Sequence, residues 1–322
     1  SSRAVSPKRR RGIGIVLSVM GETITRSDPP TLCLGMSSPI SHVSDTAHWV
    51  AMYRAMESER PDALFHDPYA RRLAGTQGEA ILRTMPRAKA FAWPMIVRTA
   101  VMDEIIVRAI ARDGVRTVVN LASGLDARAY RLELPRALRW IDVDLPAMQS
   151  YKREALGAET PRCALEWIPA DLADAAQRRA VLSQVTAGPA PALVITEGLL
   201  IYLEPDQVAG LARDLHACAP LAWWLTDLAS PRLIKMMERT WGRKLRAGGA
   251  PFRFAPAEGT AFFEPLGWRE TEFRSNWEEA QRLNRTMRFA KFWSLIGRLY
   301  PKKTRESFRR MAGIVLLRRE EV

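Results

Sequence analysis

The sequence predicts an α/β fold with a doubly wound, seven-stranded sheet, and two observations support this prediction. Short β-rich runs alternate with helical stretches through the middle of the chain, as in parallel βαβ units with right-handed crossovers. Three successive runs end in an acidic residue, at Asp144, Asp171 and Glu197. Because the carboxyl ends of parallel strands meet at one edge of a sheet, these acids are expected to share a crevice there.

Length and composition are those of a globular protein. The chain has 322 residues, enough for one large α/β domain with insertions or for two small domains. Its three cysteines show no CxxC spacing and its four histidines form no HxxxH pair, so neither a disulfide framework nor a metal site is predicted. A reducing cytoplasm is the simplest compartment. No apolar run approaches the ~20 residues that span a bilayer, so no membrane segment is expected.

Positive charge is concentrated at the two ends of the chain, which carries a formal net charge of +13. Such basicity can indicate nucleic acid or another anionic partner, but an arginine-rich composition with solvated faces is the favoured interpretation. Residues 1–40 mix Pro, Ser, Arg and Gly without periodicity and are expected to form a poorly ordered extension. Residues 41–322 are expected to form a single domain.

Helices are predicted before the first strand. Residues 47–56 and 68–82 have the pattern of short helices. A clearer helix is predicted over 96–111, where apolar residues recur at four-residue spacing.

The middle of the chain supplies five predicted strands, over 116–121, 138–144, 165–171, 192–197 and 222–228. Residues 205–217 form the clearest helical pattern between them. The C-terminal part then breaks the alternation with a helix over 232–246, which Ser230 would cap and Gly248-Gly249 would end. The last predicted elements are a strand over 268–274, a helix over 290–299 and a strand over 313–319.

The turn after the first strand contains one glycine, Gly124. A glycine lets the backbone pass close to a ligand because no Cβ stands in the way. The turn lacks the GxGxxG spacing, which argues against a pyrophosphate-binding nicotinamide site. Taken alone it could equally be a simple strand-to-helix turn.

An acid follows the second strand, twenty residues after Gly124. Asp144 is placed to accept hydrogen bonds from both hydroxyls of a ribose, although helix capping before Pro146 is the alternative. Strand alternation puts Asp142 on the same side, where a buried carboxylate requires a partner. Asp171-Leu172 and Glu197-Gly198 end the next two strands and could meet an adenine and the rest of such a ligand, or only cap helices.

Several stretches, taken in order, resemble the leucine carboxyl methyltransferase superfamily and its bacterial O-methyltransferase branch. They include VVNLASGLDARAYRL at 118–132, TEGLLIYL at 196–203, and the runs at 51–73, 96–105 and 141–152. The resemblance implies a class I methyltransferase fold, which is Rossmann-like, with a helical N-terminal part (44–112) and an insertion (230–265) that cap the site. Seven strands also fit such a sheet better than a six-stranded dinucleotide fold.

The same resemblance implies S-adenosylmethionine as the cofactor. The residues implied to bind it are Arg98, Ala122, Gly124, Asp144, Asp171, Leu172 and Glu197. The guanidinium of Arg98 would bind the methionine carboxylate, since its fork suits a carboxylate bidentately. Ala122 stands where the family usually has glycine, so a slightly tighter turn is expected.

An oxygen acceptor is expected from two absent motifs. The (N/D)PP(Y/F) element of amino-directed enzymes does not follow the fourth strand, and no Pro-Cys pair of cytosine-carbon enzymes occurs. No catalytic base can be identified. The favoured acceptor is a small molecule such as a polyketide-like metabolite, in a pocket lined by Met236, Met237, Trp241, Phe252 and Phe254. The alternatives are a protein C-terminal carboxylate, an NAD-dependent oxidoreductase and a basic RNA-binding module.

Overall fold

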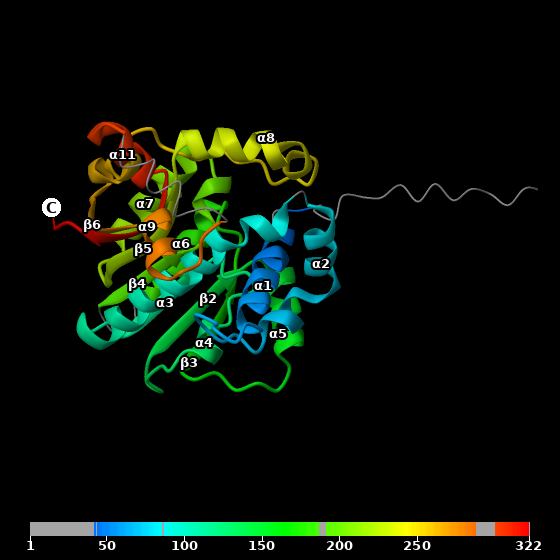
Figure 1. Cartoon of the computed structure of the whole chain (residues 1–322). Helices are drawn as coiled ribbons and strands as arrows, with labels where there is room; N and C mark the ends of the chain where they lie inside the picture. Colours follow the sequence, from blue (N-terminus) through cyan, green and yellow to red (C-terminus); the bar gives the residue numbers. More distant parts are fainter. Residues whose placement is uncertain (1–41, 43, 86, 187–190, 288–299, 322) are drawn as a thin grey trace, which may run out of the picture. The chain divides into compact units, whose positions relative to one another are not determined.

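A seven-stranded sheet in the order β3-β2-β1-β4-β5-β7-β6 forms the centre of the fold (Figure 1). The strands are β1 Thr117–Leu121, β2 Arg139–Asp144, β3 Ala164–Pro169, β4 Ala192–Thr196, β5 Leu221–Ala229, β6 Trp268–Ser275 and β7 Ala312–Arg319. All seven strands therefore lie where the sequence predicted them. The doubly wound α/β prediction is confirmed.

The computed structural model describes residues 42, 44–85, 87–186, 191–287 and 300–321. The described residues all fall within one unit, Ser37–Val322. Two predictions lie outside the described residues: the extension over 1–40 and the helix over 290–299.

The helices are α1 Asp45–Ser58, α2 Ala70–Thr84, α3 Trp93–Arg112, α4 Arg128–Arg131, α5 Pro146–Leu156, α6 Ala175–Thr186, α7 Pro205–Ala217, α8 Pro231–Ala247, α9 Asn276–Arg282 and α11 Lys302–Arg309. Three 3-10 helices join them: η1 Ala88–Phe91, η2 Leu200–Tyr202 and η3 Gly259–Leu266. Ser230 caps α8 as predicted, because its hydroxyl oxygen accepts a hydrogen bond from the N–H of Leu233 at 3.4 Å. Within the described residues, no helix has both the length and the apolar character that crossing a bilayer requires.

The sheet departs from simple βαβ alternation at its C-terminal end. β1 to β5 are joined by parallel pairs, but β7 enters between β5 and β6 and is antiparallel to both. The third strand also ends at Pro169, before the predicted Asp171. The Asp171 carboxylate accepts a hydrogen bond from the N–H of Ala173, which turns the chain away from the sheet.

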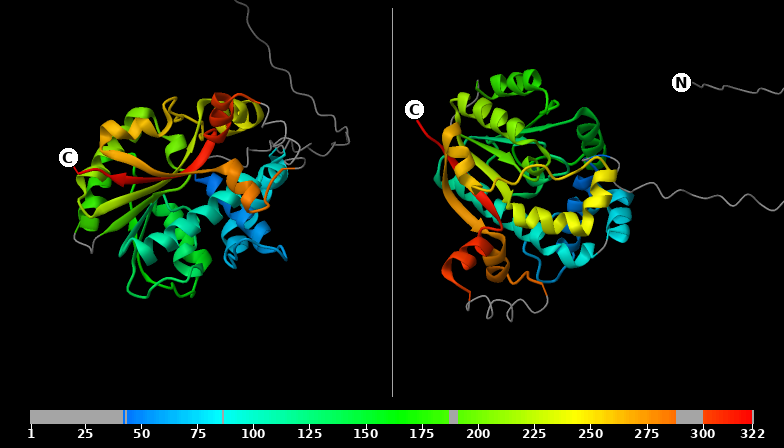
Figure 2. Two further views of the ribbon diagram at one scale, coloured as in Figure 1. Left: turned by 60° about the vertical axis from the view of Figure 1, so that its left-hand side comes forward. Right: turned by 90° about the horizontal axis from the view of Figure 1, so that it is seen from above.

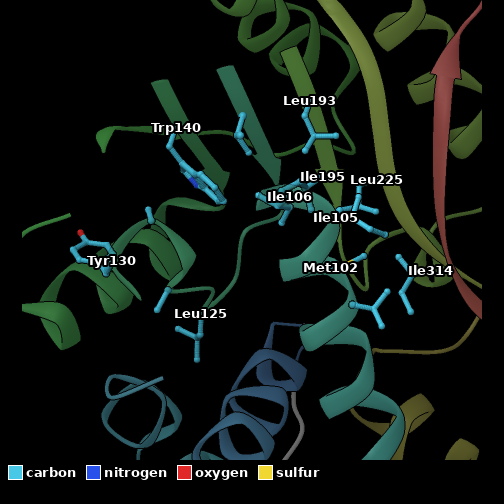
Figure 3. Packing of buried hydrophobic residues seen from close by; sticks show 14 of the residues in the cluster. Met102, Ile105, Ile106, Leu125, Tyr130, Trp140, Leu193, Ile195, Leu225 and Ile314 are labelled. Carbon is cyan, nitrogen blue, oxygen red and sulfur yellow. The ribbon is translucent and has the colours of Figure 1, made fainter. Parts of the chain in front are cut away.

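Helices cover both faces of the sheet (Figure 2), and apolar residues pack against each face. Neighbouring strand residues alternate between the faces, so Val118 packs with α3 and α5 while Val119 packs with α6 and α7. Figure 3 shows Met102, Ile105 and Ile106 of α3 facing the sheet, and all three are fully buried. The apolar residues that recur at four-residue spacing in the predicted helix over 96–111 therefore identify the face that packs against the core.

Helix α2 is not continuous as predicted. Its backbone breaks at Gly75, where φ is 55° and ψ is −167°. A Cβ at this position would lie 2.7 Å from the hydroxyl oxygen of Tyr151, and that hydroxyl donates a hydrogen bond to the carbonyl of Leu73. The break occurs because glycine alone adopts this backbone easily and leaves room for Tyr151.

A third apolar cluster joins the C-terminal insertion to the N-terminal helices. The Trp241 ring of α8 packs edge-on against Trp49 of α1 and Phe91 of η1, with centroids 5.4 and 5.2 Å apart. Leu245 of α8 is buried in the same cluster. This packing fixes α8 across the end of the unit (Figure 1).

The buried carboxylate of Asp142 has the partner that the sequence required. It accepts hydrogen bonds from Lys152 Nζ at 2.7 Å and from Trp140 Nε1 at 2.8 Å. Even with Lys152 beside it, burial raises the pKa of Asp142 above its ordinary value. The buried Asp142 carboxylate is therefore paired, but it would become an unpaired buried charge if Lys152 were removed.

Replacing Lys152 by Met should destabilise the fold by about 3–5 kcal/mol near neutral pH, because it leaves the Asp142 charge buried and unpaired. The pKa of Asp142 in the folded state should then rise further above its unfolded value. Protonation would thus favour the folded state, and part of the lost stability should return as the pH falls from neutral through the raised pKa of Asp142. Urea unfolding across this range measures both effects, with exposed Lys303→Met as the control. A pH-independent loss would contradict this account.

Candidate active site

The carboxyl ends of the parallel strands open into a cavity of about 1300 Å³. Residues that follow β1 to β5 form its floor, and α1, α3, η2, α8 and α11 contribute to its walls. The cavity is lined by every residue predicted to bind a ligand: Arg98, Ala122, Gly124, Asp144, Asp171, Leu172 and Glu197. The shared crevice expected from the strand ends is therefore present.

The turn after β1 is tied directly to the acid after β2. The N–H of Gly124 donates to Asp144 Oδ2 at 2.6 Å, and the N–H of Leu145 donates to Asp144 Oδ1 at 2.7 Å. Burial raises the pKa of Asp144, while these two donors oppose the rise. Asp144 thus keeps a fixed carboxylate at the cavity wall.

Ala122 and Gly124 both have a left-handed backbone, with φ of 52° and 47°. The Cβ of Ala122 is strained at this positive φ, whereas Gly124 adopts it freely. Between them, the hydroxyl of Ser123 is buried and has no hydrogen-bond partner among the described residues. It lines the cavity and is available to a bound polar group.

Asp171 and Leu172 lie at a more exposed part of the cavity. The carboxylate of Asp171 accepts a hydrogen bond from the N–H of Ala173 at 2.9 Å. The carbonyl of Leu172 accepts one from Arg178 Nη1 at 2.9 Å. Asp171 therefore shapes a turn as well as facing the cavity.

A buried ion-pair chain runs beneath the cavity floor. Arg98 Nε lies 2.9 Å from Glu197 Oε1 without making a hydrogen bond, and its Nη1 donates to Asp227 Oδ2 at 3.0 Å. Glu197 Oε2 in turn accepts from Arg128 Nη1 at 2.6 Å. Burial alone would raise the pKa of Glu197, but Arg128 and Arg98 hold it below its ordinary value.

Arg128 is the centre of this chain. Besides Glu197, it donates to Asp126 Oδ2 at 2.9 Å and, through Nε, to Asp103 Oδ1 at 2.6 Å. Arg131 then pairs with Asp103 at 2.7 Å. Asp67 continues the chain, since it lies 3.8 Å from Arg131 and 2.8 Å from Arg54.

The ion-pair chain contains four guanidiniums and five carboxylates, which leaves an excess of one negative charge. Its members are Arg54, Arg98, Arg128, Arg131, Asp67, Asp103, Asp126, Glu197 and Asp227. A buried negative excess stabilises a bound cation. The floor of the cavity is therefore complementary to a ligand with net positive charge.

Sequence reasoning missed Asp227. It follows the same rule as the three acids that were predicted, because it lies in the last part of β5 at the same edge of the sheet. Its Oδ1 accepts the N–H of Gly198 at 2.7 Å while its Oδ2 accepts from Arg98. An acid near the end of the predicted fifth strand was the available signal.

The wall opposite the floor is apolar. The five residues predicted to form an acceptor pocket all line it: Met236, Met237, Trp241, Phe252 and Phe254. Trp241 and Phe254 are buried, while Met236 is 46% exposed at the opening. The cavity thus combines a charged floor with an apolar wall, a common composition for a small-molecule site.

The sheet order, with an antiparallel β7 between β5 and β6, and the contact of Gly124 with Asp144 are those of the class I methyltransferase fold. The sequence model described as leucine carboxyl methyltransferase matches residues 47–216. This match covers more than half of the chain. The chain belongs to the leucine carboxyl methyltransferase family.

Related sequences agree with this assignment. A protein of Frankia alni named "Putative S-adenosyl-L-methionine-dependent methyltransferase" is 32% identical over 72% of this chain and 85% of its own length. A protein of Streptomyces coelicolor with the same description is 38% identical, but the chain spans only 62% of its length. A DUF574 family structure from Streptomyces avermitilis has a TM-score of 0.57 at 13% identity, covering 88% of this chain and 99% of its own. This last likeness concerns the fold.

The residues present fit S-adenosylmethionine. The negative excess of the ion-pair chain suits the net positive charge that the sulfonium gives this molecule. The buried hydroxyl of Ser123, which lines the cavity, lacks a hydrogen-bond partner among the described residues. A polar group of such a ligand can satisfy it.

Replacing Ala122 by Gly should stabilise the fold by about 1 kcal/mol, because glycine adopts a positive φ without a Cβ clash. Cofactor affinity should stay the same or increase. Urea unfolding and calorimetric titration of S-adenosylmethionine measure the two effects. The matched control is Ala127→Gly, at a φ of −114°, which should destabilise the fold. Loss of stability in both variants would show that the turn is not strained.

Proposed function

We propose that this protein transfers the methyl group of S-adenosylmethionine to an oxygen of an apolar small molecule, either a carboxylate or an acidic hydroxyl. The observation that carries the proposal is the single cavity with a charged floor and an apolar wall. A polyketide-like or other secondary metabolite is the favoured acceptor class. Such a molecule could lie against Met237, Trp241 and Phe252 with one polar group turned to the floor.

The cofactor residues are proposed from their positions at the floor. Arg98 would bind the methionine carboxylate with its guanidinium fork, held in place by Glu197 and Asp227. Asp144 would accept the ribose hydroxyls, and Asp171 with Leu172 would lie beside the adenine. When bound, the cofactor supplies an electrophilic methyl group on a sulfonium. The protein residues then have to align the acceptor with it.

The residue after β4 supports oxygen rather than nitrogen as the acceptor atom. The (N/D)PP(Y/F) element of amino-directed enzymes is absent after this strand, where Glu197 is instead ion-paired with Arg98 and Arg128. Leu199 and Leu200 follow in place of a Pro-Pro element.

The described residues that line the cavity include carboxylates but no histidine, the most frequent general base. Tyr202 lines it, and burial raises the pKa of its hydroxyl, so this hydroxyl stays protonated and serves as a donor. A protonated hydroxyl can orient the oxygen that receives the methyl group, but it cannot remove a proton from that oxygen. An acceptor that is already ionised, or ionises easily, is therefore favoured.

The alternatives differ in what they would bind. A protein C-terminal carboxylate would use the same cofactor site and the same donor, Tyr202. An NAD-dependent oxidoreductase would need a pyrophosphate site, but the turn after β1 has a single glycine and the family match favours S-adenosylmethionine. Acceptor screening with free acids, phenols and carboxyl-terminal peptides separates the first alternative from the proposal.

Calorimetric titration should show micromolar binding of S-adenosylmethionine and none of NAD. Asp144→Ala should weaken S-adenosylmethionine binding by about tenfold to a hundredfold, because it removes charged hydrogen-bond acceptors. Exposed Asp113→Ala, beyond the end of α3, is the matched control and should bind as the wild type does. Binding of NAD in preference to S-adenosylmethionine would overturn the proposed function.

Tyr202→Phe should lower kcat/KM for the acceptor by about tenfold to a hundredfold, since it removes a donor to an oxygen anion. The affinity for S-adenosylmethionine should not change. Steady-state kinetics with an acceptor found by mass-spectrometric screening, together with calorimetry, tests this. Tyr300→Phe, a more exposed hydroxyl at the same cavity, is the control. An unchanged kcat/KM would show that the Tyr202 hydroxyl makes no hydrogen bond to the acceptor that matters for the reaction.

A further inference from the structure

Helix α8 presents a stripe of basic side chains to solvent. Its members are Arg232, Lys235, Arg239, Arg243 and Arg246, all exposed. They recur at spacings of three and four residues and therefore share one helical face. The other face of α8 packs inward through Trp241 and Leu245. The stripe is thus held outward by the packing that anchors the helix.

Most of this stripe has no compensating charge. Arg246 lies 3.6 Å from Glu238, but Arg232, Lys235, Arg239 and Arg243 form no ion pair with any described residue. Elsewhere in the described part of the chain, arginines are commonly paired with acids, even at exposed positions such as Arg71 with Glu59. Concentrated positive charge without acids favours an anionic partner.

Exposed apolar side chains gather beside the stripe. Four large apolar side chains are exposed among the described residues, at Val107, Met236, Met287 and Tyr300. All but Val107 line the opening of the large cavity. Met236 itself belongs to α8 and lies between Lys235 and Arg239 in sequence. Met236 therefore brings α8 to the cavity opening, while the unpaired basic side chains of the stripe lie on the neighbouring face of the helix.

Helix α11 extends the basic surface. The guanidinium of Arg232 lies 4.3 Å from the centre of the Phe308 ring, which places the start of α8 beside α11 (Figure 1). Lys302, Lys303 and Arg305 of α11 are exposed, and Arg305 also lines the cavity. Arg305 is the member of this group that lines the cavity, while Lys302 and Lys303 lie beside Glu306 on the adjoining surface of α11.

We propose that this surface binds an anionic lipid bilayer and that acceptors enter the cavity from it. The basic rim, as we define it, consists of Arg232, Lys235, Arg239, Arg243, Lys302, Lys303 and Arg305. The basic side chains pair with lipid headgroups while Met236 enters the interface, as in peripheral amphipathic helices. Entry of a lipophilic acceptor rests on the proposed function, whereas the lipid binding does not.

The composition of α8 favours lipid over other anions. Single-stranded nucleic acid is bound by exposed aromatic residues among basic ones. On α8 the one aromatic residue, Trp241, is buried, and beside α11 only a single aromatic residue of the described part of the chain, Tyr300, is exposed. A specific protein partner needs a packed cluster of large anchors. On α8 the exposed apolar side chain is the flexible Met236, which suits a fluid surface.

Co-sedimentation of the full chain with vesicles tests the proposal. The protein should bind vesicles of phosphatidylcholine with phosphatidylglycerol, should not bind phosphatidylcholine alone, and should dissociate as salt is raised. The triple variant Arg232→Gln, Lys235→Gln and Arg239→Gln should lower the partition coefficient roughly a hundredfold. The matched triple variant Arg112→Gln, Arg116→Gln and Arg179→Gln, which removes the same charge elsewhere, should bind like the wild type.

Absence of binding to the anionic vesicles, or an equal loss in both triple variants, would overturn the proposal. So would tighter binding of single-stranded RNA or polyglutamate that the first triple variant abolishes, since the partner would then be another polyanion. Calorimetry with S-adenosylmethionine runs in parallel and should give the same affinity for all variants. If the wild type does not bind S-adenosylmethionine, the proposed function is wrong. The vesicle result still decides the proposed lipid binding on its own.

Discussion

The geometry of the cavity floor depends on the guanidinium of Arg128. Three carboxylates from different parts of the chain converge on it: Asp103 of α3, Asp126 after β1, and Glu197 after β4. A buried charge left without its partner costs several kcal/mol, so these parts cannot separate without a large penalty. Arg128 thereby holds α3 against the ends of β1 and β4.

The charged floor and the apolar core have separate tasks. Burial on the two sheet faces, as in the α3 packing of Figure 3, supplies the stabilisation. Buried ion pairs add little net stability against apolar replacements. Their value here is orientation: Glu197 and Asp227 hold Arg98 from two sides, so its guanidinium is fixed before any ligand arrives. A site fixed in advance loses less entropy on binding.

Local patterns predicted the seven strands, because strand residues carry their own β-rich and apolar signal. The Gly124–Asp144 contact was also predictable, since β1 and β2 are neighbours and both residues follow strand ends. The pairing of Arg98 with Asp227 was not, because it joins residues 129 positions apart and has no local signature. The place of β7 between β5 and β6 and the break at Gly75 likewise depend on tertiary packing.

The two halves of the cavity come from different parts of the chain. The family match over residues 47–216 contains the floor except for Asp227, including the whole set predicted from strand ends. The apolar wall and the basic rim come mainly from α8 and α11, which lie beyond that range. Because Trp241 packs α8 against the N-terminal helices, the two halves are nonetheless joined rigidly. We therefore expect the cofactor to be a property of the family and the acceptor, with its route of entry, a property of the C-terminal insertion.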